Sequence, residues 1–450
     1  MRIFIDQFVY DQRNKGNVSL LQTAVNRLSE LWPKARIDVL TESPYSLKLY
    51  CPNVHPVSYY SSHNWSDSQH RKIYLHQILP RPAIRALLEA REELIFRRSS
   101  PPSFPVGDQS DNKVLPVQAS QERLDIANPE DDETNPDIDQ AIRNADLVVA
   151  SGGGYMVDSG STRSLVFLDR LAKAIKLNKT TVMVGQGVDV LENPALVRKA
   201  KEVLPAIDLF FYREKIVAPK VLSSLGVRPE RMVMTGDDAV ELAYRERSSV
   251  WGNGIGVNLR VAMYTDVHIT DFIKIIRSVL HSTADRYNAT LVALPISHWI
   301  QEADDKFIRQ LINGYPRKSI SWLKYVSPLD VIRRVRRCRV VVTAAFHPAV
   351  FALSQGIPVV GLIKSKEYKK KFQGLADEFG SSCQIVELND NSIQEKLTLA
   401  IQSAWETAEQ VRPHLLDVAE SQIRAGKAAY RRIYDLVNDR EKNGTGLNEH

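Results

Sequence analysis

The sequence has few cysteines and no long apolar run, and both absences narrow the class of protein. Its 450 residues include three cysteines, Cys51, Cys338 and Cys383, which are far apart and form no C-x-x-C pair. A disulfide framework or a cysteine-based zinc site is therefore not expected. No stretch approaches the roughly 18 consecutive apolar residues of a membrane-spanning helix. The first residues, MRIFID, also lack the features of a secretion signal, so we expect a cytoplasmic protein.

Common catalytic and cofactor motifs are missing as well. The chain contains no H-E-x-x-H metal site, no G-x-S-x-G nucleophile elbow, no Walker loop and no G-x-G-x-x-G dinucleotide fingerprint. Asp237 and Asp238 follow a predicted strand, where we expect them to cap the chain's exit rather than hold a metal ion. We predict no metal requirement and no resident cofactor.

Positive charge is in mild excess, with a formal net charge of +6, and its clustering is more informative than its sum. Two basic runs flank residues 341–362. They are Arg333, Arg334, Arg336, Arg337 and Arg339, and Lys364, Lys366, Lys369, Lys370 and Lys371. Most of these side chains are expected on solvated helix faces, although together they would attract an anionic substrate. They lack the regular aromatic interleaving of a nucleic-acid site, so no nucleic-acid partner is predicted.

What the sequence does contain is an alternation of apolar strands and amphipathic helices. It occurs in two series separated by residues 242–253, and 44% of all residues are hydrophobic. This alternation places helices on both faces of a mostly parallel sheet. We predict an α/β protein of two doubly wound, Rossmann-like domains that face a cleft. The predicted limits are residues 1–245 and 253–438, followed by a frayed tail at 439–450.

The alternation is interrupted in the first domain. Residues 17–31 are predicted to be a helix with Asn17 as its N-cap, and a strand follows. Residues 41–140 then lose the pattern. They include an apolar and basic helical stretch at 74–98, and the following residues 99–137 contain six prolines. We interpret residues 41–140 as an irregular insertion on the surface.

The stretch from Val341 to Leu362 contains the clearest candidate for a functional side chain. Its pattern predicts a strand at 340–343, a helix at 348–355 and a second strand at 358–362. Ligands of α/β sheets bind where a strand ends and the next helix begins, and His347 lies at that corner. A lone histidine commonly caps or packs such a turn. The alternative is that it meets an anion or a reacting oxygen.

Other strand ends carry glycines and cations. Residues 151–154 (SGGG) and 185–187 (GQG) each predict either a tight turn or a cradle of backbone N–H groups for a ligand. Arg213 and Arg260 follow strands of opposite domains, and guanidinium groups match carboxylate or phosphate. His298 follows another strand of the second domain, where it lies either in the cleft or on a surface loop.

These motifs occur in a familiar order. The segments are an asparagine-rich turn and helix at 17–31, DLVVASGGGYMVDSGS, VMVGQGVDV, DLFFYREKIVAPKVLSSLGV, MVMTGDDAVEL, GIGVNLR and FHPAVFALSQGIPVVGL. In this order the chain resembles the polysaccharide pyruvyl transferase family across both predicted domains, with the insertion at 41–140 outside the match.

The resemblance implies a fold, a reaction and a set of residues. Family members are similar in fold to two-domain GT-B glycosyltransferases and transfer the pyruvyl group of phosphoenolpyruvate to a sugar diol as a ketal. The acceptor is expected at the N-terminal domain and the donor at the C-terminal domain. His347 matches a histidine that acts as general acid or base, Arg213 matches a donor ligand, and Lys371 is similar to a lysine that some members carry. The matching glycine-rich element, with the asparagine-rich turn, adds Gly152, Gly153, Gly154, Asp158 and Asn17 to the acceptor side.

One position departs from the family signature, because Ala345 replaces the arginine of Arg-x-His. Arg260 or Lys371 would then supply the missing cation, and His298 completes the predicted donor site. Phosphoenolpyruvate would be a co-substrate, and the partner would be a glycan or lipid-linked saccharide, with no transmembrane segment and at most peripheral contact with a membrane. Residues Tyr59, His63 and Trp65 are expected to contact that acceptor. Two alternatives stay open: a GT-B glycosyltransferase that uses a nucleotide sugar, and a non-catalytic scaffold.

Overall fold

Two parallel β-sheets organise the chain. The computed structural model describes residues 1–7, 9–59, 135–260, 269–297, 304–319, 327–363 and 365–445. An eight-stranded sheet has the order β3-β2-β1-β4-β6-β7-β8, with β5 beside β6. Its strands are β1 (Arg2–Asp6), β2 (Arg36–Thr41), β3 (His55–Ser58), β4 (Leu147–Ala150), β5 (Gly153–Met156), β6 (Thr180–Val188), β7 (Leu209–Tyr212) and β8 (Met232–Met234).

The second sheet is six-stranded and has the order β11-β10-β9-β12-β13-β14. Its strands are β9 (Gly254–Asn258), β10 (Thr290–Ala293), β11 (Lys318–Ser319), β12 (Cys338–Thr343), β13 (Val359–Ile363) and β14 (Cys383–Glu387). Parallel pairing brings the carboxyl ends of all strands in a sheet to one edge, which is where α/β proteins bind ligands.

Helices cover both faces of the first sheet, as its apolar strands require. Successive side chains of β1 point to opposite faces, so Phe4 packs with α6, α7, α8 and α9, whereas Ile3 and Ile5 pack with α1, α2 and the end of α16. The helices are α1 (Lys15–Leu31), α2 (Pro44–Tyr50), α6 (Pro136–Asn144), α7 (Ser161–Lys176), α8 (Pro194–Val203), α9 (Ala218–Ser224) and α16 (Ile393–Thr445).

The second sheet is covered in the same way. Helices α11, α12 and the first part of α16 pack on one face, and α13, α14, α15 and the middle of α16 pack on the other. The core between the second sheet and helices α13, α14 and α15 also contains Leu20 of α1 and Val240 of α10. This core therefore joins the two domains. These helices are α10 (Ala239–Arg245), α11 (Ile269–Arg286), α12 (Asp304–Ile312), α13 (Pro328–Val335), α14 (Phe346–Ser354) and α15 (Lys366–Phe379).

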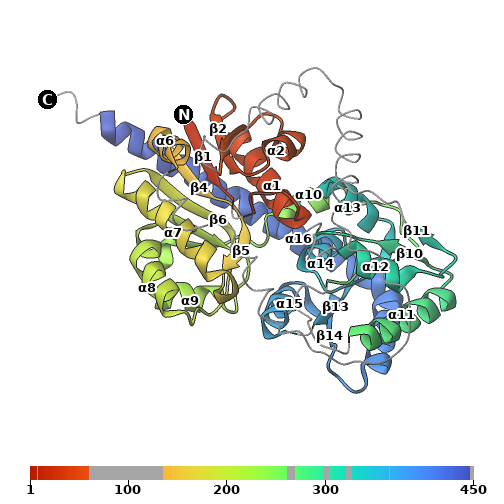
Figure 1. Cartoon of the computed structure of the whole chain (residues 1–450). Coiled ribbons are helices and arrows are strands. Elements are labelled where there is room, and N and C mark those ends of the chain that lie inside the picture. Colours follow the sequence, from red (N-terminus) through yellow and green to blue (C-terminus); the bar gives the residue numbers. More distant parts are fainter. Residues whose placement is uncertain are drawn as a thin grey trace, which may run out of the picture.

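Helix α16 connects the two domains. It is 53 residues long and runs from the second domain to the first (Figure 1). Trp405 packs in the core of the second domain, whereas Tyr430 and Ile433 pack under the first sheet. Residues near the predicted end of the second domain therefore contact the first. The helix also continues into the expected frayed tail, where Arg440 donates to Asp208 at 2.6 Å.

Several local predictions were wrong. Asn14, rather than Asn17, caps α1: its side chain accepts from the N–H groups of residues 16 and 17. The glycines at 152–154 lead into strand β5 rather than directly into a helix, and residues 185–187 lie inside β6. Gly185 has φ +58°, which lets the strand bulge at this point.

The predicted insertion at 41–140 is ordered at both ends. Helix α2 and strand β3 lie at its start, and α6 begins at Pro136. Short helices and an edge strand gave too little periodicity to be recognised in the sequence. The helical stretch predicted at 74–98 lies outside the described residues. Within those that are described, no helix is long and apolar enough to cross a membrane.

Candidate functional site

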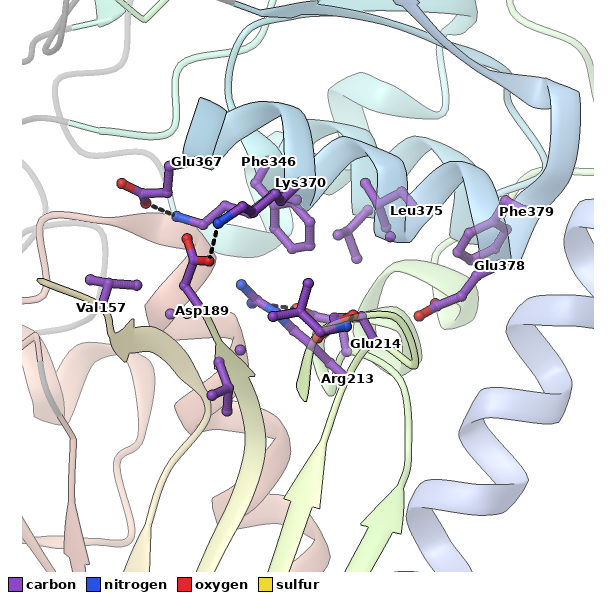
Figure 2. Close-up of a pocket in the computed structure, with 18 of the residues that line it drawn as sticks. Val157, Asp189, Arg213, Glu214, Phe346, Glu367, Lys370, Leu375, Glu378 and Phe379 are labelled. Atoms are coloured by element: carbon purple, nitrogen blue, oxygen red, sulfur yellow. Dashed lines mark hydrogen bonds and ion pairs between the residues drawn. The ribbon is translucent and has the colours of Figure 1, made fainter. Parts of the chain in front are cut away.

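A cavity lies between the carboxyl ends of the first sheet's strands and helices α14 and α15 of the second domain (Figure 2). It has about 630 Å³ of empty space, part of it open to solvent. Loops after β6, β7 and β8 form one wall, and the face of α15 forms the other. This is the position predicted for a ligand in a two-domain α/β fold.

Arg213 is the central cation of this cavity. It follows β7, and only 7% of its side chain is exposed. Its Nη1 donates to Asp237 Oδ2 at 3.0 Å, and its guanidinium lies 4.4 Å from the centre of the Phe346 ring. A Cβ at Gly187 would come within 2.6 Å of Arg213 Nη2. The chain therefore needs glycine at 187 to leave room for this side chain.

Two lysines of α15 face Arg213 across the cavity. Lys370 Nζ binds Asp189 Oδ1 at 2.7 Å, which ties α15 to the loop after β6. Lys371 pairs with Glu367 one turn earlier on the same helix, and its Nζ lies 3.9 Å from the Cβ position of Gly154. Lys371 therefore approaches the glycine-rich element of the first domain. The pair of lysines adds positive charge opposite Arg213.

His347 lies beside these cations at the start of α14. Its side chain does not cap the helix, because the N-cap is Ala345 and has no side-chain hydrogen bond. The residue is 8% exposed and its ring packs on Gly16 of α1, where a Cβ would come within 2.0 Å of Nδ1. Nε2 is buried and has no hydrogen-bond partner within the described part of the chain.

The surroundings of His347 favour the neutral imidazole. Burial lowers its pKa to about 4, opposed by Asp237 and reinforced by the positive charges of Arg213, Arg260 and Lys371. The fold therefore brings four residues predicted from the sequence into one electrostatic cluster. His347 is not part of the described cavity wall, but its neighbours Phe346 and Arg213 are.

Arg260 enters this cluster from the second domain. It follows β9, is partly buried, and acts on both His347 and the buried Asp304. His298, the other donor-site candidate of this domain, lies outside the described residues, and so do His63 and Trp65. Tyr59 stacks on Tyr10 with ring centres 4.4 Å apart, so it packs against the first core.

The predicted acceptor residues do not form a single site. Gly154 lines the main cavity, whereas Gly152 and Asn17 line a second, smaller cavity of about 200 Å³ together with Gln7 and Tyr155.

Two members of the predicted cradle shape the backbone instead. Gly153 lies under the ring of Tyr155, where a Cβ would come within 2.5 Å of the ring. Asp158 accepts from the backbone N–H groups of Glu192 and Asn193 at 2.7 and 3.1 Å. Asp158 thus holds the loop after β6 and is in neither of the two cavity walls.

Asp237 and Asp238 have different partners, which the sequence alone did not separate. Asp237 accepts from the N–H of Ala239 at 2.9 Å and also from Arg213, whereas the N-cap of α10 is Asp238, whose side chain makes no capping bond. Asp238 instead accepts from Arg27 at 2.6 Å and from the Tyr430 hydroxyl at 3.2 Å, away from the cavity. Asp237 is therefore part of the cavity wall, and Asp238 is part of the buried core.

Glu378 was missed by the sequence analysis. It lies near the end of α15, lines the main cavity, and accepts from Gln422 Nε2 at 2.6 Å. Burial and the negative charges of Asp237 and Glu214 raise its pKa to about 8, although Gln422 and Arg213 act in the opposite direction. No motif marks this residue. Only its place on the helical face that contains Lys371 and Leu375 would have indicated it.

Most of the two basic runs are not part of the cavity. Arg333 pairs with Glu246 and Arg339 with Glu409, both at the surface. In the parts of the chain that the structure describes, no group of three or more His, Cys, Asp or Glu residues could hold a metal ion. The residues in and beside the cavity offer cations, a neutral imidazole and carboxyl groups.

Sequence comparison finds a family for most of the chain. A family model described as polysaccharide pyruvyl transferase matches residues 14–364. No curated protein matches the chain. The match runs from the turn before α1 to the end of β13, leaves out strand β1, and includes Arg213, Arg260 and His347.

Solved structures show the same architecture at low sequence identity. A putative UDP-N-acetylglucosamine 2-epimerase from Listeria monocytogenes has a TM-score of 0.57 and 11% identity, covering 98% of this chain and 97% of that chain. MnaA from S. aureus, in a co-structure with UDP, has a TM-score of 0.54 and 14% identity over 96% and 94%. A UDP-glucosyltransferase from Polygonum tinctorium has a TM-score of 0.51 and 11% identity, covering 97% of this chain and 98% of that chain. These likenesses confirm the predicted pair of Rossmann-like domains.

Proposed function

Because the chain belongs to the polysaccharide pyruvyl transferase family, we propose that it transfers the pyruvyl group of phosphoenolpyruvate to two neighbouring hydroxyl groups of a saccharide, forming a ketal. One observation carries the proposal: three cations from different elements surround a neutral, buried histidine beside a cavity. Phosphoenolpyruvate is small and carries both a carboxylate and a phosphate, so it needs several cations within a short distance.

The donor would be bound mainly by Arg213 and Lys371. Arg213 presents a planar guanidinium whose geometry matches carboxylate or phosphate, and Asp237 holds it in place. Lys371 adds a point charge from the opposite wall, and its present partner Glu367 lies on its own helix. Arg260, as the third cation, would compensate for Ala345 at the position of the family arginine.

His347 would act as the base for the acceptor hydroxyl. A pKa of about 4 keeps its imidazole neutral at pH 7, and a neutral imidazole accepts protons rather than donating them. Nε2 has no partner among the described residues, so we assign this step to that ring nitrogen. The structure thus favours proton removal from the hydroxyl over protonation of the donor, which the sequence left as equal possibilities.

The acceptor would approach from the first domain. The smaller cavity is lined by Gly152 and by Gln7 and Asn17, whose side chains carry amide groups. Amide and hydroxyl groups are suited to hydrogen bonding with sugar hydroxyls without charge selection. The family supports a saccharide acceptor in general terms, and its identity would be set by the surface around this cavity.

Incubation with phosphoenolpyruvate and candidate saccharides tests the proposal. We expect phosphate release together with a pyruvyl mass increment on the saccharide. His347→Asn should lower kcat by roughly 100- to 10,000-fold, the usual contribution of a general base. The exposed His414 provides the matched control, since His414→Asn should leave turnover unchanged.

Three outcomes would contradict the proposal. One is an unchanged rate in His347→Asn, which would remove that residue's role. Another is thermal stabilisation by UDP or GDP but not by phosphoenolpyruvate, which would favour a glycosyltransferase that uses a nucleotide sugar. Absence of stabilisation by either type of donor would indicate a scaffold without catalysis.

A further inference from the structure

Helix α15 contributes a carboxyl group as well as cations to the main cavity. Lys371, Leu375 and Glu378 are spaced by four and three residues, so they share one face of the helix, and all three line the cavity. Glu378 is the seventh residue after Lys371, which places it about 10 Å further along the helix axis. Figure 2 shows the Glu378 side chain extending from α15 toward the side of the cavity that holds Arg213 and Glu214.

Among the described residues, Glu378 has a neutral partner but no cation paired with it. Gln422 Nε2 donates to its Oε2 at 2.6 Å, and the same amide packs on Gly236, which has φ +73° and room for no side chain. Oε1 has no hydrogen-bond partner among the residues described. This carboxyl group is therefore held in position by one amide while its other oxygen is left available.

Every nearby cation is paired elsewhere. On α15 itself, Lys370 binds Asp189 and Lys371 binds Glu367. Across the cavity Arg213 binds Asp237. The remaining cation pairs with the residue next to Glu378, since Lys215 Nζ lies 3.1 Å from Asp377. Two further carboxylates, Glu214 and Asp237, face Glu378 from the loops after β7 and β8 and oppose its ionisation.

Glu378 lines the cavity as a protonated acid, and His347, whose neighbours Phe346 and Arg213 line the same cavity, is a neutral base. The pKa of Glu378 is raised to about 8 by burial and by its acidic neighbours, while that of His347 is lowered to about 4 by burial. When the environment separates two titratable groups in this way, their acid and base roles are separated too. At pH 7 Glu378 can donate a proton and His347 can accept one.

We propose that Glu378 donates the proton that converts the methylene carbon of phosphoenolpyruvate into the methyl group of the ketal. This role rests on the proposed pyruvyl transfer and supplies the acid that His347 cannot be. The electron pair of the carbon–carbon double bond forms the new C–H bond, and the O–H bond of Glu378 breaks. The central carbon becomes electron-poor, and the enol-phosphate oxygen beside it stabilises the charge.

The remaining steps restore both groups. The first saccharide hydroxyl adds to the central carbon and gives its proton to His347. The bond from that carbon to the phosphate oxygen breaks, and the departing phosphate receives the proton held by His347. The second hydroxyl then adds to the same carbon, and its proton returns to the Glu378 carboxylate. One hydroxyl proton thus ends on the methyl group and the other on phosphate, so the transfer needs no further reactant.

Glu378→Gln tests the proposal, because glutamine imitates the neutral acid in size and charge but cannot protonate carbon. We expect kcat to fall by roughly 100- to 10,000-fold, while the KM for phosphoenolpyruvate stays close to that of the wild type and the melting temperature does not fall. Glu378→Asp should retain part of the activity. Asp377→Asn is the matched control, since this exposed neighbour pairs with Lys215 outside the cavity wall and its loss should not change kcat.

A pH profile provides a readout that a structural role would not change. Wild-type kcat should fall above about pH 8 as Glu378 loses its proton, and the residual activity of Glu378→Gln should lack this fall. An active wild type without an alkaline fall, or with an equally active Glu378→Gln variant, would overturn the proton-donor role and leave the transferase proposal intact. A wild type without any turnover would overturn both.

Discussion

Two buried arginine–aspartate pairs use adjacent aspartates, Asp237 and Asp238, and they differ in how much of the arginine's hydrogen-bonding capacity the protein leaves without a partner. Arg27 binds Asp238 at 2.6 Å and Glu241 at 2.9 Å, and its guanidinium lies 5.0 Å from the centre of the Tyr430 ring. All its contacts are within the protein, between α1, α10 and α16. The Arg27–Asp238 pair therefore joins helices and has no surface for a ligand.

The Arg213–Asp237 pair has the opposite character. Arg213 has one carboxylate partner at 3.0 Å and one aromatic face, and the rest of its guanidinium lines a cavity. Both arginines are almost fully buried, so burial does not distinguish them. The comparison teaches that a charged cluster is a candidate site when its hydrogen-bonding capacity exceeds the partners that the protein supplies.

The comparison predicts opposite defects for two matched substitutions, and these are the largest effects. Arg27→Met should lower the free energy of unfolding by about 3–5 kcal/mol, because Asp238 and Glu241 would lose a buried partner. Arg213→Met should instead lower kcat/KM by roughly 100- to 1,000-fold through loss of charge stabilisation. Denaturant unfolding and steady-state kinetics on both variants check this. Equal loss of stability in the two would show that Arg213 is also structural.

A smaller effect is expected from the glycines that accommodate each arginine. A Cβ at Gly187 would come within 2.6 Å of Arg213, and one at Gly426 within 2.7 Å of Arg27. Gly187→Ala should raise the KM for phosphoenolpyruvate by displacing the guanidinium. Gly426→Ala should lower the melting temperature, although alanine in helix α16 recovers up to about 1 kcal/mol. Kinetics and thermal unfolding separate the two, and a raised KM in Gly426→Ala would weaken the comparison.

The smallest effects concern stability as a function of pH. The unfolded chain binds a proton at a histidine below pH 6.5, but folded His347 does so only near pH 4, so stability should fall as pH drops through this window. Folded Glu378 keeps its proton up to about pH 8, far above the ordinary value of 4.5, so stability should also fall as pH rises from 4.5 to 8. His347→Asn should flatten the acid side and Glu378→Gln the alkaline side. Chemical unfolding at several pH values checks both slopes, and unchanged slopes would contradict the burial of these groups.

The sequence predicted those parts of the site that lie at strand ends. Arg213, Arg260 and His347 each follow an apolar strand, and parallel pairing brings such positions to one edge of a sheet. This geometry is a property of the fold class, so periodicity was enough to find them. Lys371 was added by the family resemblance, and the structure places it in the same cluster.

Features that depend on tertiary packing could not be predicted. Glu378 is one acidic residue in a helix with several charges, and only contact with Gln422 and the cavity distinguishes it. Asp237 and Asp238 have different roles because they bind different arginines, Arg213 and Arg27, which are far from them in sequence. The continuity of the 53-residue helix α16 also depends on packing, because Pro413 lies inside it and proline usually ends or kinks a helix.

A crystal structure of the protein with phosphoenolpyruvate would test the central claim most directly. We expect density in the main cavity with the carboxylate or phosphate within hydrogen-bond distance of Arg213 and Lys371, and with the methylene carbon toward Glu378. Donor density elsewhere, with Arg213 still bound only to Asp237, would contradict it.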